Sequence, residues 1–246
     1  RIGGRFQIAK TLANIGMAYV RLGASDHGLR YLYRARDAHD RYNDHDAQLD
    51  TALVTATALL ELGRTEEAFS YLVAVRNAPA EGFAVYDQVH IGIVTALYAL
   101  AKGETEDAMH SAAQAGKLAE EQTLVSYRVY AHAIEAFAHA QLGEVDAART
   151  LALGALTTIE EMEGSEYGIE VRGLCCRALA TVVDSGHEEK LSQDAFARAR
   201  QYVESITKNI RKPSHVTSFH GRPVVRQILM TDHQAGDSPY SSGTLS

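Results

Sequence analysis

Along this sequence of 246 residues, a glycine recurs at an interval of 40 residues. The four positions are Gly23, Gly63, Gly103 and Gly143, and a short polar or acidic stretch follows each of them. Because glycine readily adopts the left-handed conformation that ends a helix, each position is typical of a turn between two helices. Such turns predict antiparallel hairpins, and since one hairpin cannot bury its apolar side alone, neighbouring hairpins must stack.

The residues after each glycine carry the signals that begin a helix. Thr65 and Thr105 are predicted to cap the helices that follow them, because a threonine hydroxyl can accept from the free N–H groups of a first turn. The acidic residues behind them favour the positive end of the helix dipole. A looser fifth repetition at Gly186, 43 residues after Gly143, predicts a fifth hairpin.

Composition agrees with a helical domain. Hydrophobic residues make up 46% of the chain and charged residues 22%, as in soluble globular proteins, and proline, which opposes helix most strongly, occurs only four times. We expect an all-α domain over residues 1–230 and a disordered tail over 231–246. The hairpins are expected at about 8–42, 47–80, 84–121, 124–162 and 166–210, and a capping helix at about 221–230.

Small and large residues alternate within the hairpins in a way that allows close helix pairing. In the second hairpin, the small, large, small, large and small positions are Ala56, Leu59, Ala68, Leu72 and Val75. At these positions the chain resembles the tetratricopeptide repeat (TPR) family over about residues 8–210. The family's period is about 34 residues, and the period of 40 is similar to repeats that lie C-terminal to ATPase or kinase modules in large bacterial signalling regulators.

The resemblance implies a right-handed α-α superhelix whose concave groove is lined by the first helix of each hairpin. Carrying over the family's groove positions gives a mixed apolar and polar set without a dense cationic clamp. This set favours an apolar helix or peptide as the ligand. The candidate partner-binding residues are Met17, Arg21, Asp50, Thr57, His90, Leu97, Tyr130, Ile134 and Phe137.

The resulting hypothesis is a protein-protein interaction module that holds a partner segment or a neighbouring domain, such as an ATPase or kinase domain of the same protein. The chain begins at Arg1 rather than at methionine, which we interpret as a piece of a longer protein or a trimmed one. The resemblance implies that the longer protein is a signalling or transcription-regulatory protein. The alternative is a sensor domain for a small ligand or a peptide signal. An enzyme is not expected, because no catalytic constellation, phosphate-binding loop or cofactor motif emerges.

Two features that could indicate metal binding or redox chemistry have simpler structural explanations. His132, Glu135 and His139 share one helical face, but a single helix rarely supplies a closed metal site, so no metal is predicted. Cys175 and Cys176 are neighbours, and adjacent helical cysteines point about 100° apart, which disfavours a disulfide. Two core cysteines and a reducing, cytoplasmic location are the simpler interpretation.

Charge argues against nucleic acid as the partner. The formal net charge is −7, whereas nucleic-acid surfaces depend on lysine and arginine. The segment 208–226 carries five cations and no acids, and we interpret it as a basic helix end followed by the closing helix. No stretch approaches the roughly 18 apolar residues that a membrane span needs, so no membrane association is expected.

Overall fold

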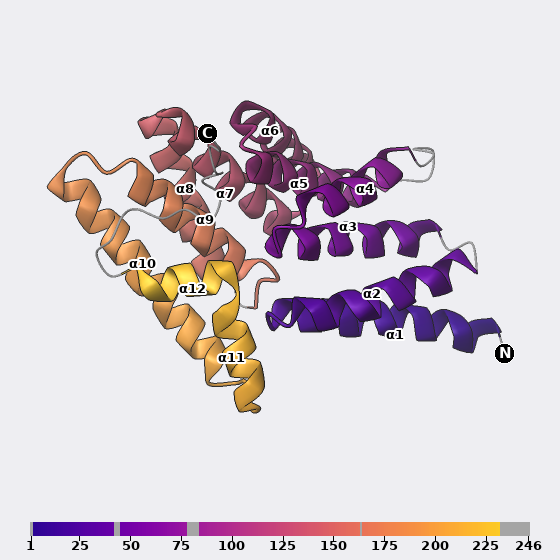
Figure 1. The fold of residues 1–246 in the computed structure, drawn as a ribbon. Coiled ribbons are helices and arrows are strands. Elements are labelled where there is room, and N and C mark those ends of the chain that lie inside the picture. The colour runs from indigo at the N-terminus through magenta and orange to yellow at the C-terminus, as the bar shows by residue number, and fades with distance from the viewer. Residues whose placement is uncertain (1, 42–44, 78–83, 163, 232–246) are drawn as a thin grey trace, which may run out of the picture.

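The computed structural model describes residues 2–41, 45–77, 84–162 and 164–231, which form twelve helices (Figure 1). They are α1 (Ile2–Arg21), α2 (Ser25–Asp40), α3 (His45–Glu61), α4 (Thr65–Arg76), α5 (Val85–Lys102), α6 (Thr105–Glu121), α7 (Val125–Leu142), α8 (Val145–Glu161), α9 (Gly168–Thr181), α10 (Gly186–Thr207), α11 (Pro213–Gly221) and α12 (Pro223–Met230). The first ten pair into five hairpins, each packed against its neighbours. The all-α, right-handed TPR-like superhelix predicted from the sequence is confirmed.

Four hairpin turns share one backbone geometry. At Gly63, φ is +71°, the Gly63 N–H donates to the Leu60 carbonyl at 3.0 Å, and the Arg64 N–H donates to the Leu59 carbonyl at 2.9 Å. This pair of bonds satisfies carbonyls that the helix end leaves free. The same pair recurs at Gly23, Gly103 and Gly143, so the predicted role of these glycines is confirmed.

Two expectations about helix starts are wrong. Thr65 and Thr105 are the first helical residues rather than caps, and no side chain caps either helix. The acidic residues lie in the first turns as expected, and favour the dipole there. In the fifth hairpin, Gly186 begins α10 instead of ending α9, and the Ser185 hydroxyl caps that helix by accepting from the Glu188 N–H.

The turn between α6 and α7 uses a left-handed threonine. Thr123 has a φ of +56°, and the Leu124 N–H donates to the Ala119 carbonyl at 2.8 Å, as in the glycine turns. A β-branched residue is strained in this conformation. We therefore expect Thr123→Gly to raise the free energy of unfolding by about 0.5–1 kcal/mol, the relief of strain exceeding the entropic cost of glycine.

Chemical denaturation of the wild type and the variant would measure this gain. Gln122→Gly is the matched control, because Gln122 has an ordinary negative φ of −101°. The control should lose stability by a few tenths of a kcal/mol or more. Equal effects at both positions would contradict strain at Thr123.

The C-terminal segment forms two short helices where one capping helix was predicted. Pro213 and Pro223 each begin a helix, and Arg222 between them is extended, with φ −57° and ψ 134°. Proline lacks the N–H that would continue α11 and pushes the residue before it out of the helical region. The break orients α12 so that Val225 and Ile228 are buried, and α12 packs against α9 and α10.

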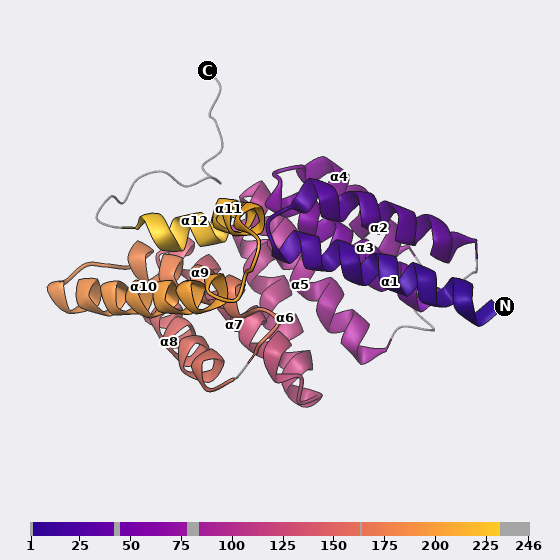
Figure 2. The same cartoon turned by 90° about the horizontal axis from the view of Figure 1, so that it is seen from below.

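The two C-terminal helices also reach back to the first hairpin. Both Figure 1 and Figure 2 show α11 and α12 between α10 and the turn that joins α1 to α2. A Cβ atom added at Gly23 in that turn would lie 2.1 Å from the Ser218 carbonyl oxygen and 2.6 Å from Cγ of Arg222. The first and fifth hairpins are thus bridged by α11 and α12, which the sequence did not predict.

The sequence also carried predictions for the cysteine pair, the C-terminal tail and membrane spans. Cys175 and Cys176 are free thiols buried in α9, and burial raises the pKa of the Cys176 thiol to about 12, so both act as core residues. The tail predicted at 231–246 lies, apart from Thr231, outside the described residues. Within the described part of the chain, every helix is too short or too polar to cross a bilayer.

Candidate functional site

The first helices of the hairpins line a concave groove that holds two adjoining hollows. The first, which we call the apolar chamber, has a cavity volume of about 110 Å³ and is partly open to solvent. The second, which we call the polar chamber, has the same cavity volume and is also partly open. Both chambers are lined by Thr57, Glu61, Tyr130 and Glu170, which therefore stand where the two meet.

The apolar chamber has leucines and aromatic rings on its walls. Leu97 and Leu100 come from α5, and Phe137 from α7, where the Arg177 guanidinium lies 3.8 Å above its ring. Helix α12 closes one side with Pro223, Val224 and Gln227. A Cβ atom added at Gly173 of α9 would lie 2.2 Å from Cγ2 of Val224, so this small residue lets α12 approach closely.

An ion cluster crosses the groove between the chambers. The Arg222 guanidinium is 3% exposed and donates to Glu61 at 2.5 Å and to Glu170 at 2.6 Å. It also donates to the carbonyl of Arg21 at 3.4 Å, which ties the cluster to the first hairpin. Arg222 therefore connects the first, second and fifth hairpins.

Burial and charge act in opposite directions within this ion cluster. Burial alone would lower the pKa of Arg222, but the Glu170 and Glu61 carboxylates raise it above its usual range, so the guanidinium stays charged. Burial raises the pKa of Glu61, against the lowering effect of Arg222. Arg222 is one of the five cations of segment 208–226, and the other four are exposed.

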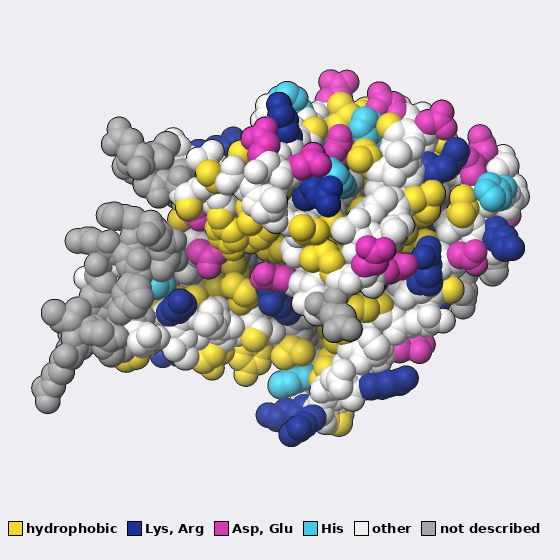
Figure 3. All heavy atoms as spheres, turned by 180° about the vertical axis from the view of Figure 1, so that it is seen from behind, with side chains coloured by type: hydrophobic (Ala, Val, Ile, Leu, Met, Phe, Trp, Pro, Cys, Tyr) yellow, Lys and Arg dark blue, Asp and Glu magenta, His cyan; other side chains and the backbone are white. Residues whose placement is uncertain are grey.

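Figure 3 shows the face opposite to that of Figure 1, where dark blue basic side chains gather at the lower edge, near the place of α11 in Figure 1. The exposed cations of the basic segment are Lys208, Arg211, Lys212 and Arg226. The predicted basic helix end is therefore present, whereas Arg222 is turned into the protein.

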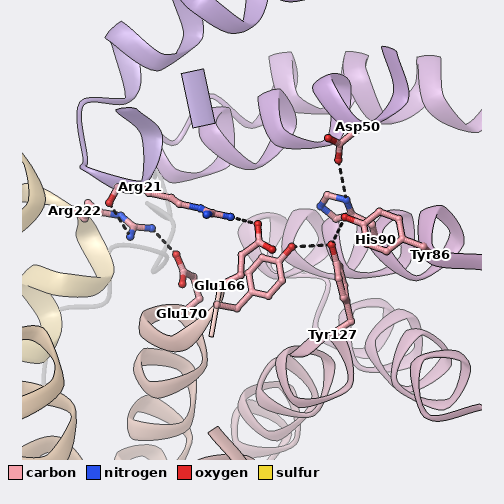
Figure 4. A network of polar contacts seen from close by, with 9 residues as sticks. Arg21, Asp50, Tyr86, His90, Tyr127, Glu166, Glu170 and Arg222 are labelled. Atoms are coloured by element: carbon pink, nitrogen blue, oxygen red, sulfur yellow. Dashed lines mark hydrogen bonds and ion pairs between the residues drawn. The ribbon is translucent and has the colours of Figure 1, made fainter. Parts of the chain in front are cut away.

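Tyrosine rings build the wall of the polar chamber (Figure 4). The Tyr167 hydroxyl donates to the Tyr127 hydroxyl at 3.1 Å, which donates to the Tyr86 hydroxyl at 2.6 Å. The rings of Tyr130 and Tyr167 stack with centroids 4.7 Å apart. Burial raises the pKa of Tyr127 and Tyr167 well above the usual value, so these hydroxyls stay protonated and act as donors.

The open side of the polar chamber carries charged side chains. Arg21 from α1 forms an ion pair with Glu166, which precedes α9, so the first and fifth hairpins meet here as well. Asp50 from α3 faces His90 from α5, and Asp50 Oδ1 lies 3.9 Å from His90 Nδ1 (Figure 4). Burial lowers the pKa of His90 to about 4, which leaves the imidazole neutral at pH 7.

The structure brings eight of the nine candidate residues to these chambers. Six of them line the polar chamber, and the other two, Leu97 and Phe137, line only the apolar chamber. The polar set is Met17, Arg21, Asp50, Thr57, His90 and Tyr130, of which Thr57 and Tyr130 also line the apolar chamber. The exception is Ile134, whose side chain is fully buried in the core, so its assignment to the groove is wrong.

Sequence reasoning missed three charged residues that shape the groove: Glu166, Glu170 and Arg222. The two acids stand at the start of the fifth hairpin, where the 40-residue glycine spacing fails and the groove positions could not be carried over. For Arg222 the sequence contains no distinguishing signal, because the other four cations of the same segment are exposed and only the fold shows that Arg222 is buried with counter-charges.

Comparisons with known proteins give a fold and no family. No family model matches the chain, and no curated protein is similar to it in sequence. Among solved structures, it is similar to the "Crystal Structure of Rap Protein Complexed with Competence and Sporulation Factor", with a TM-score of 0.61 and 14% identity over 91% of this chain. At this level of identity the similarity shows the fold alone. The aligned part of this chain covers 63% of the length of the Rap chain.

Proposed function

We propose that this domain is a protein-interaction module that takes a short peptide or a short segment of a partner protein into its concave groove. The observation that carries the proposal is the pair of adjoining chambers, one apolar and one polar, on the face lined by α1, α3, α5, α7 and α9. Such a pairing suits neighbouring side chains of different chemistry on one ligand. The Rap protein of similar fold was solved with Competence and Sporulation Factor, which supports the same use of this fold.

The ion cluster limits the length of the ligand. Arg222, Glu61 and Glu170 stand between the chambers, and α12 closes the side of the apolar chamber. A long partner helix lying along the whole groove would have to displace this buried cluster, which is costly. A few extended residues that place one side chain in each chamber fit without such a rearrangement.

The second candidate is a sensor domain for a small ligand or a peptide signal. It is favoured by the bridging of the first and fifth hairpins at the same groove, since a ligand between them would change how firmly they are held. In either case we propose a regulatory part of a larger cytoplasmic protein, with no catalytic step of its own. A neighbouring ATPase or kinase domain is a candidate partner on the strength of the repeat period alone.

Substitution in the apolar chamber tests the module. Peptides selected from a random library against the whole chain should bind Leu97→Asp at least about tenfold more weakly than the wild type, because a charge replaces an apolar wall. Leu97 is partly exposed but packs against both core clusters, so the test requires that the variant keep its helical fold. Phe137 is unsuitable for this test, because it is only 6% exposed.

The matched control is Leu62→Asp, the same change at an exposed leucine of the α3–α4 turn, outside both chambers. Isothermal titration calorimetry would give the dissociation constants and circular dichroism the folded state. Selected peptides that bind Leu97→Asp as tightly as the wild type would remove the groove as the binding site.

A further inference from the structure

The polar chamber has more negative than positive groups on its wall. Four carboxylates line it, from Asp50, Glu61, Glu166 and Glu170, against the two guanidinium groups of Arg21 and Arg222. Since the nearby imidazole is neutral at pH 7, the lining carries a formal charge of −2. A lining of this charge repels an anionic ligand group and attracts a cationic one.

Both guanidinium groups form ion pairs with carboxylates of the same chamber, although Nε of Arg222 has no hydrogen-bond partner in the described part of the chain. Arg21 pairs with Glu166, and Arg222 pairs with Glu61 and Glu170. Among the described residues no lysine or arginine lies within ion-pair distance of Asp50. The ionisable side chain that lies near it is His90. Burial, and secondly Asp87, raise the pKa of Asp50, and these effects outweigh the lowering effects of His39 and Lys10.

His90 supplies an independent indication of a ligand. Its side chain is nine-tenths buried on the wall of the polar chamber, and Nδ1 has no hydrogen-bond partner among the described residues. The 3.9 Å to Asp50 Oδ1 is too long for a hydrogen bond. Buried polar atoms are nearly always paired in proteins, so an unpaired one on a residue that lines a chamber is a candidate contact for a group that the Asp50 side chain turns to admit.

The geometry of these two atoms fits a bridging donor. A neutral imidazole with its proton on Nε2 presents Nδ1 as an acceptor. A nitrogen placed beside the two atoms can lie about 2.9 Å from each, the usual hydrogen-bond length. Because the Asp50 side chain is 45% exposed, it can turn to admit the group.

The aromatic wall adds a further attraction for a cation. Rings of Tyr86, Tyr130 and Tyr167 line the same chamber. The faces of such rings are negative and attract ammonium and guanidinium groups. Because the rings of Tyr130 and Tyr167 stack on each other, the carboxylate and the imidazole acceptor define the ligand group, and the rings only add to the attraction.

We propose that the polar chamber binds a protonated nitrogen group of the ligand, which donates to Asp50 Oδ1 and His90 Nδ1, while the apolar chamber takes an adjacent apolar side chain. The inference rests on the proposed function and gives it a ligand class: a short peptide with a cationic group next to an apolar residue. The group can come from a lysine or arginine side chain or from a peptide's N-terminus.

Nuclear magnetic resonance titration of the whole chain tests the assignment. The probes are N-acetyl-lysine methylamide, N-acetyl-arginine methylamide and alanine methylamide, whose free amine represents a peptide N-terminus. N-acetyl-norleucine methylamide is the uncharged control of similar shape. At least one cationic probe should shift the His90 ring resonances in a saturable way, and its binding should weaken as the salt concentration is raised. The probe that binds shows whether the cation comes from a lysine side chain, an arginine side chain or a peptide N-terminus.

Asp50→Asn should weaken that binding about tenfold, because it removes the charge that accepts the ligand's hydrogen bond. The matched control is Asp107→Asn, the same change at an exposed residue of α6 outside both chambers, which should leave binding unchanged. Circular dichroism would check that both variants keep the helical fold.

Three results would each overturn the cation assignment. The norleucine probe could shift the His90 resonances as strongly as the cationic probes, Asp50→Asn could leave the binding of the cationic probes unchanged, or no probe could shift the His90 resonances. In any of these cases, peptides that still depend on Leu97 would leave the proposed function standing. Loss of the Leu97 dependence as well would overturn the proposed function itself.

Discussion

Arg222→Met should lower the free energy of unfolding at neutral pH by about 3–5 kcal/mol. The variant keeps the apolar stem but removes the charge that Glu61 and Glu170 share in the interior. Two carboxylates would then remain partly buried beside each other without a cation. Thermal unfolding followed by circular dichroism should show a melting temperature lower by roughly 10 °C.

The pH dependence provides the first check on this reasoning. The pKa of Glu61 is raised above its ordinary value of 4.5 in the folded wild type, and loss of Arg222 removes an effect that lowers it. The folded state then binds more protons than the unfolded state, so stability falls as pH rises through this window. The deficit of Arg222→Met should therefore shrink as the pH is lowered from neutral toward 4.5.

A triple variant provides the second check. Arg222→Met combined with Glu61→Gln and Glu170→Gln removes the cation and both charges together, so it should recover most of the lost stability. If the triple variant remains as unstable as the single one, the ion cluster is not the cause of the loss. Hydrogen exchange of 213–230 would show whether α11 and α12 detach when Arg222 alone is replaced.

Gly23→Ala should cost about 3 kcal/mol in the free energy of unfolding, the second largest effect that we expect. One part, about 1 kcal/mol, is the left-handed backbone at φ +73°. The other, about 2 kcal/mol, is overpacking, because the new Cβ atom would lie 2.1 Å from the Ser218 carbonyl oxygen, which belongs to the backbone. Chemical denaturation measures the sum.

Gly63→Ala separates the two contributions. Gly63 has almost the same φ, +71°, but no atom lies within 4 Å of its added Cβ atom. It should therefore cost only about 1 kcal/mol. Equal losses at both glycines would mean that the first hairpin does not pack against α11 and α12 in solution.

These two predictions bear on the ligand as well as on stability. Arg222 and the Gly23 turn hold α11 and α12 against the first hairpin, and Glu61 and Glu170, the ion-pair partners of Arg222, line both chambers. If the closure holds, a ligand meets two small adjoining chambers. If it opens, the ligand meets one long groove.

The repeat architecture was within reach of the sequence because its signals are local. Left-handed turns such as those at Gly63 and Gly103 favour a residue without a Cβ atom, and the spacing of these glycines indicates where four of the hairpins reverse. Small residues such as Ala68 and Ala108, both fully buried, indicate where paired helices approach closely, and this signal is also local in the sequence. Most of the groove residues follow from the register of these hairpins.

Only the tertiary structure decided how the groove is closed and charged. Arg222 lies 161 residues from Glu61 in the chain, and no local pattern states which distant carboxylates a lone cation will meet. Ile134 and Phe137 both occupy predicted groove positions, yet only Phe137 lines a chamber, because neighbouring helices bury Ile134. Local backbone preference set the hairpins, whereas long-range packing and charge pairing set the site.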